Sequence, residues 1–264
     1  MISRKIQDFL INHKMCINAS KSQLMFLLPP KDKDNLNLSL NGQIIKHQES
    51  IKILGVTLSA DMRFDEHLWA GRKSMIQGIN AKISLLKTIK PFISTHSLAQ
   101  VGASLINSSI LYAAPLWGAT TSTNLDKIQS AQIRAARFIT NKSWQRSKNK
   151  PHRQQLLKEL SWPNTRQIIN SAILNLSKKA MSKNSSFGLN NTFRAIKPLS
   201  NRGEPTVRLE HRGKITKKSN IFSVIAPALF DGLPAKMRNP LTTEKQFKVL
   251  VKKHTCTVNL LPEH

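Results

Sequence analysis

The middle of the chain repeats apolar residues at helical spacing, between about residue 68 and residue 140. In the first stretch the spacing is seven, four, four and three residues, which places these side chains on one helical face. Pro91 should end this helix, because proline lacks the backbone N–H that a helix interior requires. The apolar positions of this first predicted helix are Leu68, Met75, Ile79, Ile83 and Leu86.

Two further helices are predicted behind Pro91. We expect Ser94 to cap the second helix, Pro115 to end it and Thr123 to cap the third. The second helix has two apolar faces, as expected for a central helix that is buried on both sides. One face carries Leu98, Val101, Leu105 and Tyr112, the other Ile106 and Ile110, and the third helix carries Leu125, Ile128, Ala135 and Ile139. Short connections then predict a compact bundle of three antiparallel helices.

The first 60 residues have a mixed pattern. An amphipathic start predicts a short helix, and residues 36–42 alternate strictly and end in Asn-Gly, the strongest short signal for a hairpin turn. Residues 51–58 are rich in β-branched residues and read as a strand. We therefore expect an α+β fold that is predominantly helical, with a short N-terminal α/β piece containing a hairpin.

The last part is basic and more irregular. Residues 142–153 form a basic tract that we expect to be mobile, and residues 182–220 have the composition of a flexible linker or long exposed loop. A helix is predicted from about residue 164 to 181, and Thr243 and Gln246 are spaced as a capping box before a last helix. The predicted segments are residues 1–60, 61–141 and a basic extension, 142–264.

Charge changes the picture most. The 264 residues carry a formal charge of +27, and residues 141–264 contain 24 of the 41 Lys and Arg residues against 6 of the 14 Asp and Glu residues. Such an excess repels itself unless a polyanion neutralises it, so RNA and DNA are the expected partners. An anionic membrane surface is the less favoured alternative. Polar residues interrupt the long uncharged stretch after Lys90, so we expect a buried helix there and not a membrane span. The two cysteines lie far apart, which favours an intracellular setting, nucleus or cytoplasm.

The sequence contains no complete catalytic arrangement. A polymerase of the two-metal type needs converging carboxylates, and no Asp-Asp pair occurs in the chain. Asp65, Glu66 and His67 could share a metal, but they open a predicted helix, where acidic residues favour the positive end of the dipole. We expect no catalytic residue, no metal site and no cofactor in this chain.

Several segments, taken in order, resemble the non-LTR (LINE-type) retrotransposon reverse transcriptases in the region that follows their catalytic Asp-Asp. Residues 14–26 match with Asn18 and Lys21, and residues 104–118 resemble the family's helix that ends in a tyrosine and then a tryptophan, here Tyr112 and Trp117. Residues 128–140 resemble the family's next helix. Residues 230–254 resemble the family's C-terminal pattern: Leu233 and Pro234 match it, whereas Phe230 and Asp231 differ from it. The most recognisable motif, in residues 51–68, is matched by Lys52, Leu54, Gly55, Val56, Phe64 and His67.

The resemblance implies a palm-end, primer-grip-like segment, a thumb-like bundle and a C-terminal extension. It implies a non-catalytic fragment of an RNA-directed DNA polymerase that binds template–primer, with Mg²⁺ belonging to the missing catalytic palm. The missing polymerase core is a further candidate partner, and we expect the DNA upstream to encode it. The open alternatives are a stand-alone basic helical module that binds or chaperones nucleic acid, and a non-functional relic of the element.

Candidate nucleic-acid contacts follow from the need to grip a phosphate backbone with Lys and Arg on rigid helices. A solvated helix face explains such residues equally well. The segment from Lys52 to Val56 is either a strand that approaches the primer or a tight hairpin. The rings of Tyr112 and Trp117 either stack on bases or lie in the core, and the core is favoured. The candidate contacts are Lys21, Lys52, Gly55, Lys73, Lys82, Lys87, Arg134, Arg137, Arg146, Lys148, Lys150 and Arg153.

Overall fold

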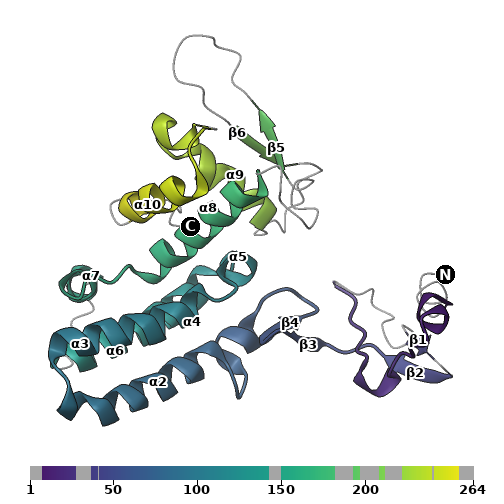
Figure 1. The fold of residues 1–264 in the computed structure, drawn as a ribbon. Coiled ribbons are helices and arrows are strands. Elements are labelled where there is room, and N and C mark those ends of the chain that lie inside the picture. Colours follow the sequence, from purple (N-terminus) through teal and green to yellow (C-terminus); the bar gives the residue numbers. More distant parts are fainter. Residues whose placement is uncertain are drawn as a thin grey trace. The chain divides into compact units, whose positions relative to one another are not determined.

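The fold is known from a computed structural model. It describes residues 8–27, 37–40, 42–142, 150–181, 193–196, 208–211, 222–239 and 241–255. The described chain is mostly helical, with two small two-stranded antiparallel sheets near the N-terminus (Figure 1). It divides into two compact units, Met1–Gly71 and Arg72–His264, each of which we describe by itself. The expected segment limits at residues 60 and 141 remain predictions.

The first unit begins with a short helical stretch, residues 8–12, and a 3₁₀ turn, η1 (Ala19–Lys21). β1 (Asn37–Leu40) and β2 (Gln43–Lys46) then pair antiparallel, with Leu40 opposite Gln43. Only two residues join the strands, and the second is Gly42 with φ of 79°, a conformation that glycine adopts without strain. The hairpin predicted at Asn-Gly is therefore confirmed.

The next segment is a second hairpin and not the single strand that the pattern of residues 51–58 predicted. β3 (Ser50–Ile53) pairs with β4 (Val56–Ser59), and Ile53 lies opposite Val56. Leu54 and Gly55 form the turn with φ of 48° and 84°, as in a two-residue type I′ turn. The tight hairpin is thus present: strand-forming residues flank the turn on both sides, and the glycine allows the chain to reverse between them. The approach of this segment to a primer stays a prediction.

Leu68 does not belong to the first long helix, so that part of the helix prediction is wrong. It lies in a short π-helical segment, η3 (Glu66–Ala70), whereas α2 (Met75–Ile89) starts only after an intervening link. Ser74 caps α2 by accepting a hydrogen bond from the Gln77 N–H at 3.5 Å. The seven-residue step between Leu68 and Met75 matched a helical period by coincidence, because residues 71–74 between η3 and α2 are not helical.

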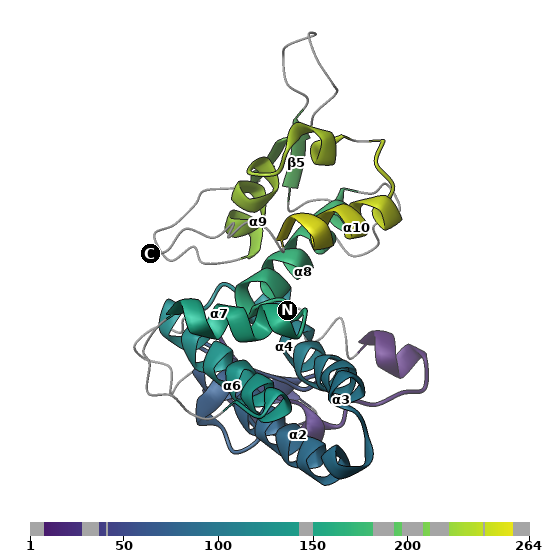
Figure 2. The ribbon, with the colours of Figure 1, turned by 90° about the vertical axis from the view of Figure 1, so that its left-hand side faces the viewer.

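The three long helices pack together as expected, with α2 and α6 (Ser122–Thr140) running alongside a central helical stretch (Figures 1 and 2). That stretch consists of α3 (Thr95–Gly102), the π-helical η5 (Ala103–Asn107) and α4 (Ser108–Leu111). Ser94 caps it as predicted, with its Oγ 3.1 Å from the Ser97 nitrogen. The fully buried side chains of the core include Ile79, Leu86, Ile106, Ile110, Ile128 and Ile139.

Two predicted helix ends in this bundle are wrong. The central stretch ends at Leu111, because Ala113 takes a left-handed conformation with φ of 52°, and Pro115 instead lies in the first turn of α5 (Ala114–Trp117). The cap of α6 is Thr121 and not Thr123: the Thr121 hydroxyl accepts a hydrogen bond from the Asn124 N–H at 3.3 Å. Pro115 thus marks the start of a helix and not an end, and the cap of α6 lies two residues before the predicted threonine.

α7 (Lys150–Glu159) and α8 (Thr165–Ala180) follow the bundle. Residues 150–153, placed in the mobile tract by prediction, are instead the first turn of α7, and residues 143–149 lie outside the described residues. α8 matches its predicted range, and Asn164 and Gln167 form a full capping box in front of it.

Gln132, fully buried in α6, connects α8 to the bundle. Its amide nitrogen donates to Asn107 Oδ1 at 2.8 Å and to the Pro163 carbonyl at 2.9 Å. Its amide oxygen accepts from Gln129 at 3.0 Å and from the Thr165 hydroxyl at 3.3 Å. The side chain therefore makes all four hydrogen bonds of which an amide is capable.

The C-terminal part contains a pair of strands that the composition did not predict. β5 (Phe193–Ile196) and β6 (Arg208–His211) pair antiparallel inside residues 182–220, the predicted linker; the remainder of that segment lies outside the described residues. α9 (Phe222–Asp231), the 3₁₀ helix η7 (Ala235–Arg238) and α10 (Glu244–Thr255) complete the unit. α8 lies between the bundle and the α9 and α10 helices (Figure 2).

The capping box predicted for the last helix is present. The Thr243 N–H donates to Gln246 Oε1 at 3.1 Å, and the Gln246 N–H donates to Thr243 Oγ1 at 3.3 Å. Behind this cap Phe247 and Val251 are fully buried, and the Phe247 ring stacks on Phe230 with 6.1 Å between the ring centroids. The ring contact joins α10 to α9, while α10 packs mainly against α8.

Candidate nucleic-acid interface

One face of α6 carries polar and basic side chains at intervals of three, four and three residues. Lys127, Ser130, Arg134 and Arg137 lie on it, exposed or half-buried, whereas Ile128, Gln132 and Ala136 on the other side are fully buried. Helical geometry requires residues with this spacing to share a face. The core packing of α6 therefore holds a basic stripe toward solvent.

A parallel polar stripe runs along α2 and consists of Gln77, Asn80, Ser84 and Lys87, all with exposed side chains. Arg134 joins the two stripes by donating a hydrogen bond from Nη2 to Asn80 Oδ1 at 2.9 Å. We call the two stripes together the α2–α6 face. α2 has no acidic residue, and Asp126 is the one in α6, so positive charge dominates this face.

Lys82 lies on the opposite side of α2, although the sequence suggested it as a nucleic-acid contact. Its ammonium donates to the Leu105 carbonyl at 3.1 Å and to the Ser109 hydroxyl. Both acceptors belong to the central helical stretch, and the side chain is half-buried. Lys82 therefore connects two helices of the bundle. Lys73 lies outside the helix on which the pattern placed it, in the exposed link before α2.

Lys90, which the sequence pattern did not single out, makes structural contacts at the end of α6. It donates to the Phe138 carbonyl at 2.7 Å and to Asn141 Oδ1, and its Nζ lies 4.3 Å from the centre of the Phe138 ring. A cation at this place compensates the carbonyl groups left without helical partners at the C-terminal end of α6. Lys127 was also missed, although the three-and-four spacing of α6 could have revealed it.

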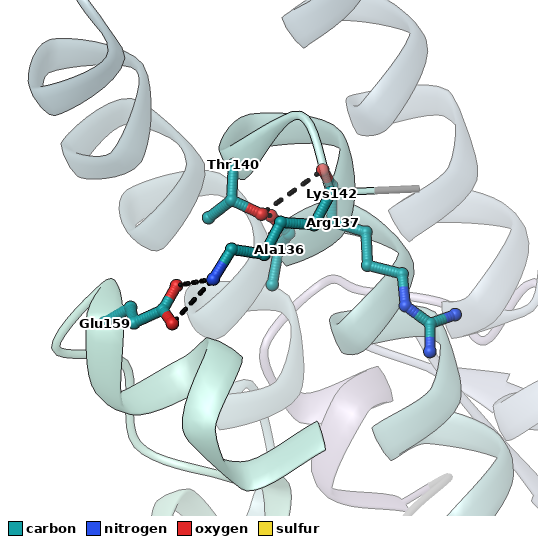
Figure 3. Close-up of polar contacts among 5 residues, drawn as sticks. All are labelled: Ala136, Arg137, Thr140, Lys142 and Glu159. Carbon is teal, nitrogen blue, oxygen red and sulfur yellow. Dashed lines mark hydrogen bonds and ion pairs between the residues drawn. The ribbon is translucent and has the colours of Figure 1, made fainter. Parts of the chain in front are cut away.

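The end of α6 is fixed by an ion pair. Lys142 Nζ lies 2.7 Å from both carboxylate oxygens of Glu159, the last residue of α7 (Figure 3). The Thr140 hydroxyl donates a hydrogen bond to the Ala136 carbonyl at 3.0 Å. Arg137 extends away from the ion pair (Figure 3). The ion pair thus joins the residue two positions past α6 to the C-terminal end of α7. Arg146 and Lys148 lie outside the described residues, and the side chains of Lys150 and Arg153 are not described.

In the first unit the candidates lie on turns and strands. Lys21 ends η1, whose first N–H groups are capped by Asn18: the Lys21 N–H donates to Asn18 Oδ1 at 3.3 Å. Lys52 is exposed on β3, and Gly55 belongs to the hairpin turn together with Leu54, whose side chain is 85% exposed. Lys52 and Gly55 therefore lie on the same hairpin.

His67 of η3 contacts strand β4 of this hairpin. It is buried, its Nδ1 accepts a hydrogen bond from the Thr57 N–H at 3.4 Å, and its Nε2 is buried without a partner. Burial lowers the pKa of His67, and the positive charge of Lys52 lowers it further. The neutral imidazole is therefore the form that fits this site. Val56 and Phe64, the other motif residues of this segment, are buried as well.

The remaining motif residues divide between core and surface. Trp117 is fully buried and donates from Nε1 to the Tyr112 carbonyl at 2.8 Å, as the favoured core interpretation predicted. Tyr112 itself is 53% exposed, so the same prediction is wrong for its ring. Leu233 is buried and its carbonyl accepts from Arg238 Nε at 3.0 Å, while Pro234 is the N-cap residue of η7.

Over the ranges that the structure describes, no three His, Cys, Asp or Glu side chains are grouped in a way that could hold a metal ion. Asp65 precedes η3 and makes no side-chain hydrogen bond to its first turn, although Glu66 does lie in that turn. The described helices include none with the length and apolar character needed to cross a membrane.

Polymerases of insect mobile elements are similar to part of this chain. The RNA-directed DNA polymerase from mobile element jockey of Drosophila melanogaster is 24% identical over 134 residues, which cover 51% of this chain and 14% of that protein. The corresponding jockey protein of Drosophila funebris is 24% identical over 139 residues, covering 52% of this chain and 15% of the relative. The probable RNA-directed DNA polymerase from transposon BS of Drosophila melanogaster is 28% identical over 111 residues, or 39% of this chain and 11% of the relative.

The chain is distantly similar to the reverse transcriptases of non-LTR retrotransposons. The similarity extends over about half of the chain and about one seventh of the length of the two jockey polymerases. No protein-family model matches the chain, and no solved structure matches it significantly. The resemblance noted from single motifs is thus supported as a distant, partial relationship to these reverse transcriptases.

Proposed function

We propose that the chain is a non-catalytic part of a non-LTR retrotransposon reverse transcriptase that binds template–primer nucleic acid. The observation that carries the proposal is the α2–α6 face, where Lys87, Lys127, Arg134 and Arg137 are presented by two helices with a common buried core. A polymerase thumb grips a duplex by its backbone and shape, which requires fixed cations and little sequence readout. We assign α2 to α6 to this thumb role.

The first unit has the complementary part in the proposal. The β3–β4 hairpin, with Lys52 beside the Leu54–Gly55 turn, is the primer-grip-like element. Its turn places an exposed backbone next to a cation, so a nucleic-acid strand can approach closely there. The basic residues 142–153 supply further contacts through their positive charge. RNA and DNA are the proposed partners, together with a polymerase core that carries the catalytic Asp-Asp and its Mg²⁺.

We propose no polymerase activity for this chain alone, because its sequence contains no Asp-Asp pair to hold two metal ions. The chain incubated with Mg²⁺, deoxynucleotides and a primed RNA template should leave the primer unextended. Primer extension that disappears in an Asp65→Ala variant would contradict both this proposal and the placement of Asp65 at a helix start.

Titration of a labelled RNA–DNA primer–template at several salt concentrations tests the binding proposal. The double variant Lys87→Gln, Arg134→Gln should lower the slope of log K against log salt by roughly 1–2, since each lost phosphate contact removes about 0.7–0.9. A matched control, Lys158→Gln with Lys179→Gln, removes the same charge from exposed positions of α7 and α8 outside the α2–α6 face. Equal slopes for the two double variants would contradict the thumb role.

A stand-alone nucleic-acid chaperone is the second candidate, and the basic tract favours it. In that case binding should be insensitive to Lys87 and Arg134, and single-stranded RNA should bind as well as the primer–template. A non-functional relic is the third, and it predicts no saturable binding at physiological salt.

A further inference from the structure

An open groove of about 590 Å³ lies between η7 and the first half of α10, far along the chain from the residues assigned above. Lys236 and Asn239 line one side of it, and Lys245 and Gln246 line the side formed by α10. Val249 and Leu250 contribute the apolar part of the lining. The groove has no role in the proposed nucleic-acid interface.

The groove exists because α10 uses only one of its faces for the core. Phe247 and Val251 are fully buried, and Lys178 of α8 reaches toward the same place, with its Nζ 3.4 Å from the Asn239 carbonyl. Val249 points away from this core and is 56% exposed. An apolar side chain on the groove side of the helix therefore remains accessible next to two lysines.

The lining selects the chemistry of a ligand. Lys236 and Lys245 are exposed lysines from the two sides of the groove, and no Asp or Glu is among the residues that line it. An anionic ligand is favoured by these charges, and an apolar group would gain by covering Val249 and Leu250. No aromatic side chain lines the groove, whereas single-stranded nucleic acids usually stack their bases on such side chains.

We propose that this groove binds an acidic segment of a partner protein, which places an apolar side chain against Val249 and Leu250. Carboxylates of the segment pair with Lys236 and Lys245. The site is a protein-docking surface, separate from the nucleic-acid-binding face, and does not depend on that function.

The test uses the complete chain and two labelled peptides, three repeats of Glu-Leu-Glu-Glu and three repeats of Glu-Ser-Glu-Glu, with binding followed by fluorescence anisotropy. The leucine peptide should bind saturably and at least about tenfold more tightly than the serine peptide, because burying one leucine side chain contributes about 1.5–3 kcal/mol. Equal binding of both peptides would show that only charge is recognised, and would overturn the proposal.

Variants locate the site. Val249→Gln and Lys245→Glu should each weaken the leucine peptide by about fivefold or more, and Lys248→Glu by no more than about twofold, since Lys248 is exposed on the same helix but does not line the groove. Equal effects at Lys245 and Lys248 would overturn the assignment. A uridine oligonucleotide that displaces the peptide, and whose own binding is lost in Val249→Gln, would assign the groove to nucleic acid instead. Circular dichroism checks that each variant is folded.

Discussion

Arg134 of α6 and Asn80 of α2 are joined by a hydrogen bond of 2.9 Å between Nη2 and Oδ1. The bond orients the guanidinium between the two stripes of the α2–α6 face and leaves its other N–H groups available for phosphate oxygens. A side chain held in place in advance loses less entropy when a ligand binds.

Asn80→Ala should therefore weaken primer–template binding by about two- to tenfold, because immobilising one flexible side chain costs about 0.5–1.5 kcal/mol. The free energy of unfolding should change by less than about 0.5 kcal/mol, as for most surface substitutions. Ser84→Ala, on the same stripe, is the control and should leave affinity unchanged. Titrations and urea denaturation measure both quantities, and equal affinities of the two variants would count against an orienting role for Asn80.

Glycines in two helices of the bundle should respond oppositely to alanine. At Gly78 in α2 a Cβ would meet no heavy atom within 4 Å, so Gly78→Ala should stabilise by about 0.5–1 kcal/mol through helix propensity. At Gly102 a Cβ would lie 2.7 Å from Ile139 Cδ1 and 3.0 Å from the Trp162 ring. Overpacking at this position costs about 1–3 kcal/mol. This cost exceeds the helix-propensity gain of alanine, so Gly102→Ala should be destabilising. The urea midpoints of the two variants measure these changes in stability. A stabilised Gly102→Ala variant would show that the side chains around Trp162 can move to accept the methyl group.

Substitution of neighbouring threonines distinguishes the real cap of α6 from the one that the sequence suggested. Thr121→Ala should cost about 1 kcal/mol, because the Asn124 N–H loses its acceptor. Thr123→Ala should be neutral or slightly stabilising, since Thr123 is an exposed residue inside the helix and alanine is the better helix former. Thermal unfolding of the two variants should differ in this order, and the reverse order would restore Thr123 as the cap.

His67 predicts a pH dependence of the first unit. Its pKa is lowered by burial and by Lys52, so below pH about 6.5 the unfolded chain takes up the proton more readily than the folded one. Stability should consequently be constant above that pH and decrease as the pH falls below it. Titration of the His67 Cε1 proton by NMR should give a pKa below the ordinary value. Lys52→Gln should raise it and Lys46→Gln, on the exposed β2 strand, should not; a Lys52→Gln variant with an unchanged pKa would remove the electrostatic part of this account.

The basic tract has its own prediction. Neutralising Arg146, Lys148, Lys150 and Arg153 together should lower the salt slope by about 0.7–0.9 for each phosphate contact that is lost. If the tract is the main contact, this decrease should exceed that of the α2–α6 double variant. The same four changes should not alter the helix content, since α7 is held by its buried Leu156 and Leu157 and not by its basic side chains. A larger effect from the double variant would make the helical face the main contact.

Local chemistry explains which elements could be predicted from the sequence. The caps at Ser94, Asn164 and Thr243 each depend on residues three positions apart, so the sequence alone contains the whole signal. The Asn-Gly hairpin is equally local. By contrast, the helix break needs a left-handed conformation at Ala113, which an alanine in the sequence does not predict. The hydrogen bond from Trp117 to the Tyr112 carbonyl stabilises this break.

The candidate site was predictable in composition but not in geometry. A helical wheel places Arg134 and Arg137 on one face of α6, yet it cannot show that Asn80 of another helix lies against them. Lys82 illustrates the opposite error: its place off the apolar stripe suggested solvent, whereas its ammonium finds acceptors in the central helical stretch. Both outcomes depend on how separate helices pack, which no local pattern encodes. The strands β5 and β6 were hidden in the same way, because their pairing joins distant residues of a polar, glycine-containing segment.

Gln132 has a consequence for how the second unit unfolds. Its four hydrogen bonds end on η5, on α6 itself, on the Pro163 carbonyl and on Thr165 at the start of α8. None of these segments can separate from the others without leaving a desolvated amide, carbonyl or hydroxyl group unpaired, at about 1–3 kcal/mol each. The central helices and α8 should therefore open together, and their slowest-exchanging amide hydrogens should share one common free energy of opening. Replacing Gln132 by leucine should give two different free energies of opening, one for the central helices and one for α8.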